Sequence, residues 1–197
     1  MKVSRGKLHE HLGMTLDYSV KSQFKITIMD YINKILECLD NTERKASSTK
    51  SSTSPMNLFV VDEDCEKLSK EKAETLHKIV ANMLFATKRA RPDTSIDKSY
   101  LTTRVRDPDQ SDWLKMVHLF KYVRGNKYLP LILSADKSGF LKWYIYVSHE
   151  LHPNMMGHIG GGLTLGRGFP ISASSNHNFN TRISTKSEIV GVDQIMP

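Results

Sequence analysis

The feature that most constrains this chain of 197 residues is a change of hydrophobic spacing at Gly125. Before it, from about residue 62, apolar side chains recur every three or four positions, as on one face of an α-helix. After it, Val, Ile, Tyr and Gly dominate, and strands are predicted over residues 129–133, 140–147 and 158–165, with a final helix from Ser184 or Thr185 to Ile195. This pattern predicts an α+β fold.

Three successive helices are predicted before Gly125, over residues 69–89, 96–104 and 109–125. Ser69 is a suitable N-cap for the first of them. Asp109, with Asp112 three residues later, gives the third helix a form of capping box. Together the three helices predict a small bundle.

The N-terminal part alternates apolar and polar residues over 12–18 and again over 24–28, which predicts a β-hairpin. A helix should follow, with Asp30 as its N-cap and Asn41 at its end. Residues 42–55 are rich in Ser, Thr and Lys and have almost no large apolar side chain. Such a segment buries too little surface to offset its ordering entropy, so we expect a flexible linker.

Charge and composition narrow the setting of the protein. A net charge of +7 and a pI near 9.3 suit a polyanionic partner. Cys38 and Cys65 have no second cysteine nearby, which argues against a zinc site and against a disulfide framework. No apolar run approaches the roughly 18 residues of a membrane span, and no secretory signal is recognisable. We therefore expect an intracellular protein, cytoplasmic or nuclear and not secreted, without a membrane partner.

Basic residues gather in the helical part of the chain. Between Lys78 and Arg106 there are seven bases and two acids. This excess has two interpretations, a solvated helix surface or a surface that binds the phosphate backbone of RNA or DNA. If they share one face, we expect the backbone to be bound by Lys88, Arg89, Arg91, Arg104, Arg106, Lys121, Arg124 and Lys127.

Two other groups of residues are interpreted as structural. His149, His152 and His158 lack the helical spacing of a zinc motif, so we expect surface histidines. The glycine-rich run at 160–168 lacks the Gly-Lys-Ser/Thr ending of a phosphate-binding loop. It is expected to form a tight hairpin.

Three C-terminal segments resemble a known family. They read LKWYIYVS at 141–148, GGGL at 160–163 and STKSEI at 184–189. In this order and spacing they resemble the start of the RNase H domain of copia-type long-terminal-repeat retrotransposon polyproteins. Earlier segments resemble the end of the reverse-transcriptase palm and the thumb and connection helices of the same family: HLGM at 11–14, DYI at 30–32, ATKRARPD at 86–93, Trp113, and YVRG at 122–125.

The resemblance implies a division of the chain into four parts. Residues 1–41 would be the end of the palm, 42–61 a linker, 62–127 the thumb and connection helices, and 128–197 a truncated RNase H-like mixed α/β unit. In the family the hairpin of residues 8–30 would lie on the palm sheet. Its apolar face should therefore be partly exposed here.

The resemblance also implies that catalytic carboxylates are missing. The family's RNase H holds two Mg²⁺ ions with an Asp on the first strand, a Glu on the first helix and further Asp residues. Here Tyr146 stands at the position of that Asp and Glu188 at that of the Glu, and the chain has no Asp-Asp pair of the kind that the polymerase needs.

We therefore expect a fragment of a reverse transcriptase/RNase H polyprotein without catalytic activity and without a metal or other cofactor. Its expected partners are the RNA or DNA backbone and the missing palm and integrase parts of the polyprotein. One alternative is a basic nucleic-acid-binding module without sequence preference. Another is a metal-dependent RNase H that acts within an oligomer.

Overall fold

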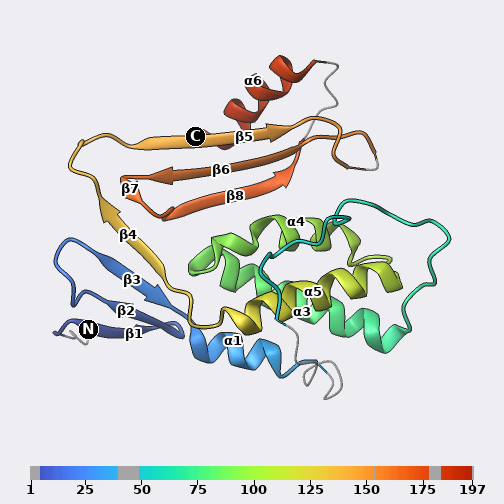
Figure 1. Ribbon diagram of the computed structural model, residues 1–197, viewed down its shortest axis with the longest axis horizontal. Helices are drawn as coiled ribbons and strands as arrows, with labels where there is room; N and C mark the ends of the chain where they lie inside the picture. Colours follow the sequence, from blue (N-terminus) through green and yellow to red (C-terminus); the bar gives the residue numbers. More distant parts are fainter. Residues whose placement is uncertain (1–4, 40–48, 153, 178–182, 197) are drawn as a thin grey trace.

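The computed structural model describes residues 5–39, 49–152, 154–177 and 183–196 (Figure 1). These residues form five α-helices and two antiparallel sheets, which confirms the α+β class. The first sheet lies beside a helical layer, the second sheet lies over that layer, and the last helix lies on the outer side of the second sheet (Figure 1).

The first sheet has the strand order β1 (Leu8–His11), β2 (Met14–Asp17), β3 (Phe24–Thr27), β4 (Leu131–Ala135) and β7 (Gly166–Arg167). β2 and β3 are antiparallel, with Thr15 opposite Thr27, so the predicted hairpin is confirmed. The position of β4 in the sequence suggests the C-terminal unit, but this strand pairs with β3. β7 in turn pairs with β4, which joins the C-terminal half of the chain to the first sheet.

The apolar face of the hairpin is partly exposed. Met14 and Ile26 are buried, whereas Leu12 is 62% exposed and Tyr18 is 49% exposed. The helix that follows, α1 (Met29–Leu36), begins one residue before Asp30. The predicted N-cap is therefore wrong, and Asp30 lies in the first turn, where its charge suits the helix dipole. The helix ends at Leu36, so the predicted end at Asn41, which lies outside the described residues, is wrong.

The helical layer consists of α3 (Lys70–Arg89), the 3-10 helix η1 (Pro92–Thr94), α4 (Ser95–Arg104) and α5 (Gln110–Gly125). The hydroxyl of Ser69 accepts a hydrogen bond from the backbone N–H of Lys72. Asp109 and Asp112 exchange both hydrogen bonds of a capping box. These contacts satisfy N–H groups that helix starts leave unpaired, and both predicted caps are confirmed.

One hydrophobic core joins the hairpin, α1 and the helical layer. Its fully buried members include Ile32, Ile35, Leu76, Ile79, Met83, Met116 and Leu119. Leu58 also belongs to this core and is 3% exposed, although it falls within the linker predicted over 42–61. The polar composition behind that prediction ends at Pro55, and residues 40–48 lie outside the described part of the chain.

The second sheet has β6 (His158–Thr164) in the centre, with β5 (Lys142–Ser148) and β8 (Ile171–Asn176) on either side. β5 and β6 match predicted strands, whereas β8 was not predicted. The glycines at 160–162 lie inside β6, so the expectation of a tight hairpin over the whole run is wrong.

The last helix, α6 (Ser184–Ile195), lies very close to the second sheet. A Cβ atom at Gly191 would lie 2.3 Å from Cγ2 of Val147, and one at Gly161 would lie 2.7 Å from Cγ2 of Ile195. Glycine at both positions therefore allows the close approach. α4 lies over the other face of the sheet, so β5, β6 and β8 are sandwiched between helices (Figure 1).

Candidate functional site

The two predicted catalytic positions lie at one edge of the second sheet but on different sides of it, since the Tyr146 ring faces α4 and Glu188 belongs to α6 on the other face. Tyr146 on β5 and Glu188 on α6 line a common pocket of about 260 Å³. The other lining residues are Ile145, Val147 and Val192, all of them apolar. β5 is an outer strand of its sheet, so this pocket lies at the sheet edge.

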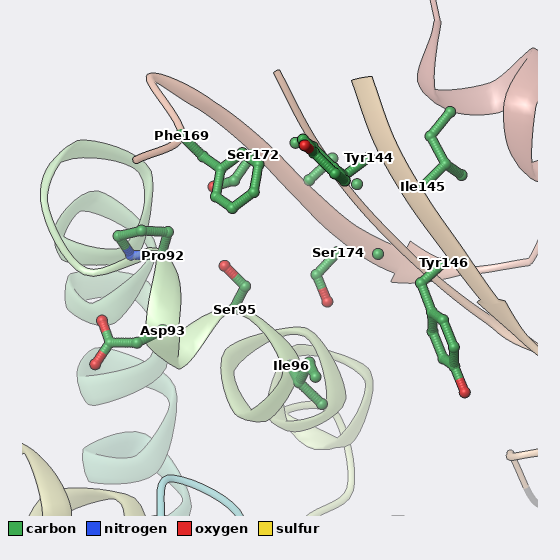
Figure 2. A pocket seen from close by; sticks show the side chains of 14 residues that line it. Pro92, Asp93, Ser95, Ile96, Tyr144, Ile145, Tyr146, Phe169, Ser172 and Ser174 are labelled. Carbon is green, nitrogen blue, oxygen red and sulfur yellow. The ribbon is translucent and has the colours of Figure 1, made fainter. Parts of the chain in front are cut away.

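The side chains in this pocket do not fit Mg²⁺. A two-metal site needs several carboxylates, since Mg²⁺ takes oxygen ligands in an octahedral arrangement. Glu188 is the one carboxylate that lines the pocket, and the ring of Tyr146 points to the face of the sheet opposite Ile145 (Figure 2). Among the described residues no group of three or more His, Cys, Asp or Glu could hold a metal ion. No catalytic step through a metal follows from this arrangement.

The eight predicted phosphate-binding cations divide between two ends of the helical layer. Arg91, just after α3, donates a hydrogen bond of 3.1 Å to the carbonyl of Asn126, just after α5. The C-terminal ends of α3 and α5 therefore meet, and near this meeting lie Lys88, Arg89, Lys121, Arg124 and Lys127. Arg104 contacts the first turn of α5, which lies about 24 Å along that helix from its C-terminal end. Arg106 follows Arg104 in the sequence.

Arg91 is 1% exposed. Its guanidinium holds the Asp93 carboxylate through two nitrogens, with N···O distances of 3.0 and 2.7 Å. It also lies 5.7 Å from the ring centre of Tyr122, whose hydroxyl donates to Asp93 at 2.9 Å. The charge of Arg91 is therefore used inside the protein and does not face a nucleic acid.

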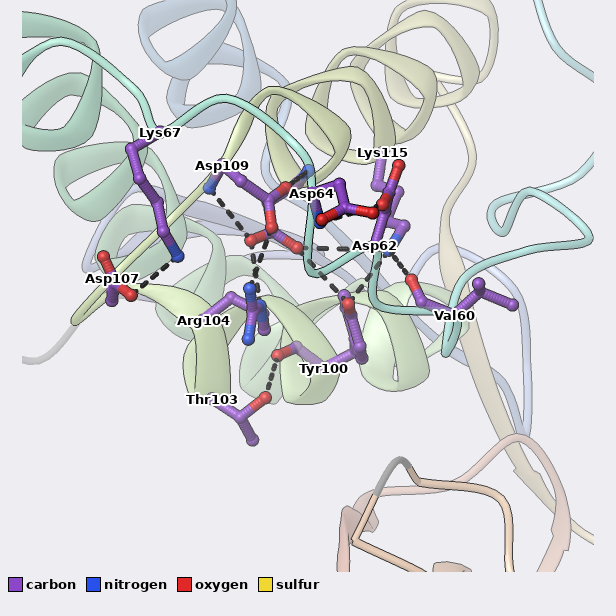
Figure 3. A network of polar contacts seen from close by, with 11 residues as sticks. Val60, Asp62, Asp64, Lys67, Tyr100, Thr103, Arg104, Asp107, Asp109 and Lys115 are labelled. Atoms are coloured by element: carbon purple, nitrogen blue, oxygen red, sulfur yellow. Dashed lines mark hydrogen bonds and ion pairs between the residues drawn. The ribbon is translucent and has the colours of Figure 1, made fainter.

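Arg104 is also engaged within the protein (Figure 3). Its Nε lies 2.9 Å from Asp112 and one terminal nitrogen lies 2.9 Å from Asp109. The same two aspartates form the capping box of α5. This arginine therefore ties the end of α4 to the start of α5.

A buried extension of this network includes Tyr100 and Lys115 (Figure 3). Lys115 Nζ donates to the Tyr100 hydroxyl at 2.9 Å and to the carbonyl of Val60, and the Tyr100 hydroxyl donates to Asp112 at 3.3 Å. Burial, followed by the charge of Asp112, raises the pKa of Tyr100, and burial lowers the pKa of Lys115. These groups satisfy one another, which indicates a structural network.

The remaining predicted cations reach the surface. Lys88, Arg89 and Arg106 are exposed, and Lys121, Arg124 and Lys127 are half-buried. The Nζ of Lys88 donates to the Ser172 carbonyl of β8 at 3.2 Å. Lys88 thus lies directly beside the second sheet.

The histidines differ from expectation. His152 and His158 are each 5% exposed, so the prediction of surface positions is wrong for them. Nε2 of His152 lies 3.0 Å from Nδ1 of His158, whose Nε2 lies 2.7 Å from Oγ of Ser174. The ring of Phe59 packs against both imidazoles. Burial, followed by the neighbouring His152, lowers the pKa of His158 to about 4, so His158 is neutral at pH 7.

One group of neighbouring residues was not predicted from the sequence. Two rows cross the face of the second sheet that is turned toward α4, namely Tyr144, Gly162 and Ser172, and Tyr146, Gly160 and Ser174. In each strand the two members stand two positions apart, which is the spacing of residues on one face. The sequence shows this spacing within each strand, but it does not show which three strands pair.

Comparisons of the chain with protein-family models, with curated proteins and with solved structures found no match. Within the described ranges no helix is both long enough and apolar enough to cross a membrane.

Proposed function

We propose that this chain is a non-catalytic part of a copia-type retrotransposon reverse transcriptase/RNase H polyprotein. The proposal is supported by the placement of Tyr146 and Glu188 around one pocket, where Glu188 is the one carboxylate among the lining residues and the Tyr146 ring points to the opposite face of the sheet. The two residues belong to an antiparallel sheet in the order β5-β6-β8 and to the helix that follows it and lies on it. The family's first metal-binding Asp and its Glu would come from these positions.

Exposed apolar side chains support a role within a larger assembly. Ile189 on α6 is 66% exposed and Ile183 just before it is 53% exposed, and Leu8 and Leu12 of the first sheet are 62% exposed. Exposed apolar side chains of this kind are open to contact with a partner protein. The outer edge of β5 pairs with no other strand in the part of the chain that the structure describes, so its backbone groups are open to a further strand. The proposed partners are the palm and integrase parts of the polyprotein.

The test is an RNase H assay on an RNA–DNA hybrid with Mg²⁺ or Mn²⁺. We expect no cleavage of the RNA strand, because Glu188 has no partner carboxylates in its pocket. The substitution Tyr146→Asp alone should not create activity, since two carboxylates still do not complete a two-metal site. Metal-dependent cleavage that disappears in Glu188→Gln would overturn the proposal. Integrase and palm sequences, intact or degraded, should also flank the gene in genomic DNA.

We propose as a second function that the chain binds nucleic acid without sequence preference. The specific observation in its favour is the meeting of the C-terminal ends of α3 and α5 through Arg91 and Asn126. It gathers Lys88, Arg89 and Lys127 at one end of the helical layer. Cations grouped in this way can neutralise several neighbouring phosphates and release their counterions.

Binding should show an affinity of roughly 10⁻⁴ to 10⁻⁶ M at physiological salt and should weaken steeply as salt increases. The double substitution Lys88→Gln and Arg89→Gln should weaken binding equally for all sequences and lower the salt slope by about 1 for each lost contact. Lys70→Gln, at the other end of α3, is the matched control and should change little. Affinity that does not depend on salt would remove this second function.

A further inference from the structure

A pocket of about 590 Å³ lies between the second sheet and the helical layer (Figure 2). Its roof is the pair of cross-strand rows in which Tyr144 and Tyr146 of β5 lie opposite glycines of β6. Its floor is formed by η1 and the start of α4, where Ser95 and Ile96 line the pocket (Figure 2). The volume is in the range of small-molecule sites, about 300 to 1,000 Å³.

The two glycines of the rows differ in what lies under them. A Cβ at Gly162 would lie 2.5 Å from the ring of Phe169, so that ring fills the space there. At Gly160 an added Cβ would meet nothing within 4 Å. The open space is thus a slot at Gly160, with Tyr146 on one side of it and Ser174 on the other.

The chemistry of this slot suits a flat aromatic ring. Tyr144 is 58% exposed and Tyr146 is 77% exposed, so their rings are available for stacking. The Ser174 hydroxyl across the slot lies 2.7 Å from Nε2 of His158 and keeps further hydrogen-bonding capacity for the edge of such a ring. Asp93 also lines the pocket, but its carboxylate is held by Arg91 and Tyr122.

A cation stands at the rim of the same pocket. Lys88 is exposed, and its Nζ donates to the carbonyl of Ser172, which lines the pocket. A positive charge beside a stacking slot matches a phosphate attached to a planar base. Proteins that bind single-stranded nucleic acid combine these two features, a charged track for the backbone and aromatic rings for unstacked bases.

We propose that this pocket binds one unstacked base of a single strand of RNA or DNA, with Lys88 on the adjoining phosphate. The inference rests on the proposed nucleic-acid-binding function and names its ligand as single-stranded. A base inside a duplex is stacked and paired, so it cannot enter the slot.

The test compares binding of a 12-nucleotide oligo(U) strand and of a 12-base-pair RNA duplex by fluorescence anisotropy at low salt. Gly160→Val fills the slot without a clash at Cβ and suits a strand. Tyr146→Leu removes one stacking ring. Each should weaken binding of the single strand by about tenfold, in keeping with loss of one stacked base, and leave duplex binding unchanged. Phe140→Leu, an exposed aromatic outside the pocket that is 72% exposed, is the control and should match the wild type.

The outcomes separate the two proposals. Equal binding of strand and duplex, unaffected by Gly160→Val and Tyr146→Leu, would overturn the base pocket and leave the basic binding function in place. Absence of binding to either nucleic acid by the wild type would overturn both. Amide chemical shifts give a second readout, since oligo(U) should move the signals of Gly160 and Gly162 in the wild type.

Discussion

Arg89 and Arg91 stand two positions apart, carry the same charge and have opposite surroundings. Arg89 is exposed at the end of α3, whereas Arg91 is 1% exposed and holds both Asp93 and the Asn126 carbonyl. The difference follows from Pro92, which starts η1 and turns the chain so that residue 91 points inward. Composition counts the two residues alike, but one can bind a ligand and the other holds two helix ends together.

Arg91→Met should lower the free energy of unfolding by about 3 kcal/mol, because it leaves the Asp93 carboxylate without its main partner. Arg89→Met is the matched control and should change stability by less than about 0.5 kcal/mol. Urea unfolding followed by circular dichroism measures both. Equal, small effects of the two substitutions would show that the Arg91 contacts add little to stability.

At the scale of elements, α6 is placed by two glycines. Gly191 on the helix and Gly161 on β6 remove the side chains that would otherwise separate helix and sheet. In an isolated helix alanine is more favourable than glycine by up to about 1 kcal/mol. Here the neighbouring methyl group of Val147 belongs to a short, stiff side chain, so the space cannot be regained by a simple rotation.

Gly191→Ala should therefore destabilise the protein, by roughly 1 to 3 kcal/mol as for other overpacked sites. Amide hydrogen exchange should speed up in α6 more than in α5. Asp193→Ala, on the exposed side of the same helix, controls for helix propensity and should be neutral or slightly stabilising. If Gly191→Ala instead stabilised the protein, the close contact between helix and sheet would be contradicted.

On the scale of the whole molecule, the N-terminal hairpin with α1 and the second sheet are attached to the helical layer by different kinds of contact. The hairpin, α1 and the helical layer share an apolar core. The second sheet meets the helical layer through polar groups, among them the buried pair His152 and His158 and the contact from Lys88 to Ser172. Within the described residues, Ile159 is the only apolar side chain of this sheet that is buried.

This polar contact predicts acid sensitivity. The pKa of His158 is about 4 in the folded protein, against about 6.5 when unfolded. As pH falls below 6.5 the unfolded chain binds a proton that the folded chain does not, so stability is lost progressively down to about pH 4. Between pH 7 and pH 5 the loss should be roughly 2 kcal/mol.

Urea midpoints at the two pH values measure this loss. The variant His158→Gln should reduce the difference between them, whereas His77→Gln, an exposed histidine on α3, should retain it. A pH dependence that is the same in His158→Gln and in the wild type would assign the effect to other groups.

The starts of α3 and α5, the β2–β3 hairpin and the α+β class could all be predicted from the amino-acid sequence. Each depends on signals within a few residues: the Ser69 side chain reaching an N–H three positions on, the Asp109 and Asp112 capping box, and alternation over short strands. The resemblance, too, is a property of local segments. Its implication for function stays a prediction.

Four features could not be predicted from the sequence and are seen in the tertiary structure alone. They are the pairing of β4 with β3, the existence of β8, the burial of Arg91 and His158, and the slot at Gly160. The physical reason is that each depends on groups far apart in the chain. The slot exists because a tyrosine, a glycine and a serine from three strands share a row, and because Phe169 fills the space at Gly162 and not at Gly160. Side-chain spacing within one strand fixes its faces, but which strand lies beside it is settled by packing across the whole molecule.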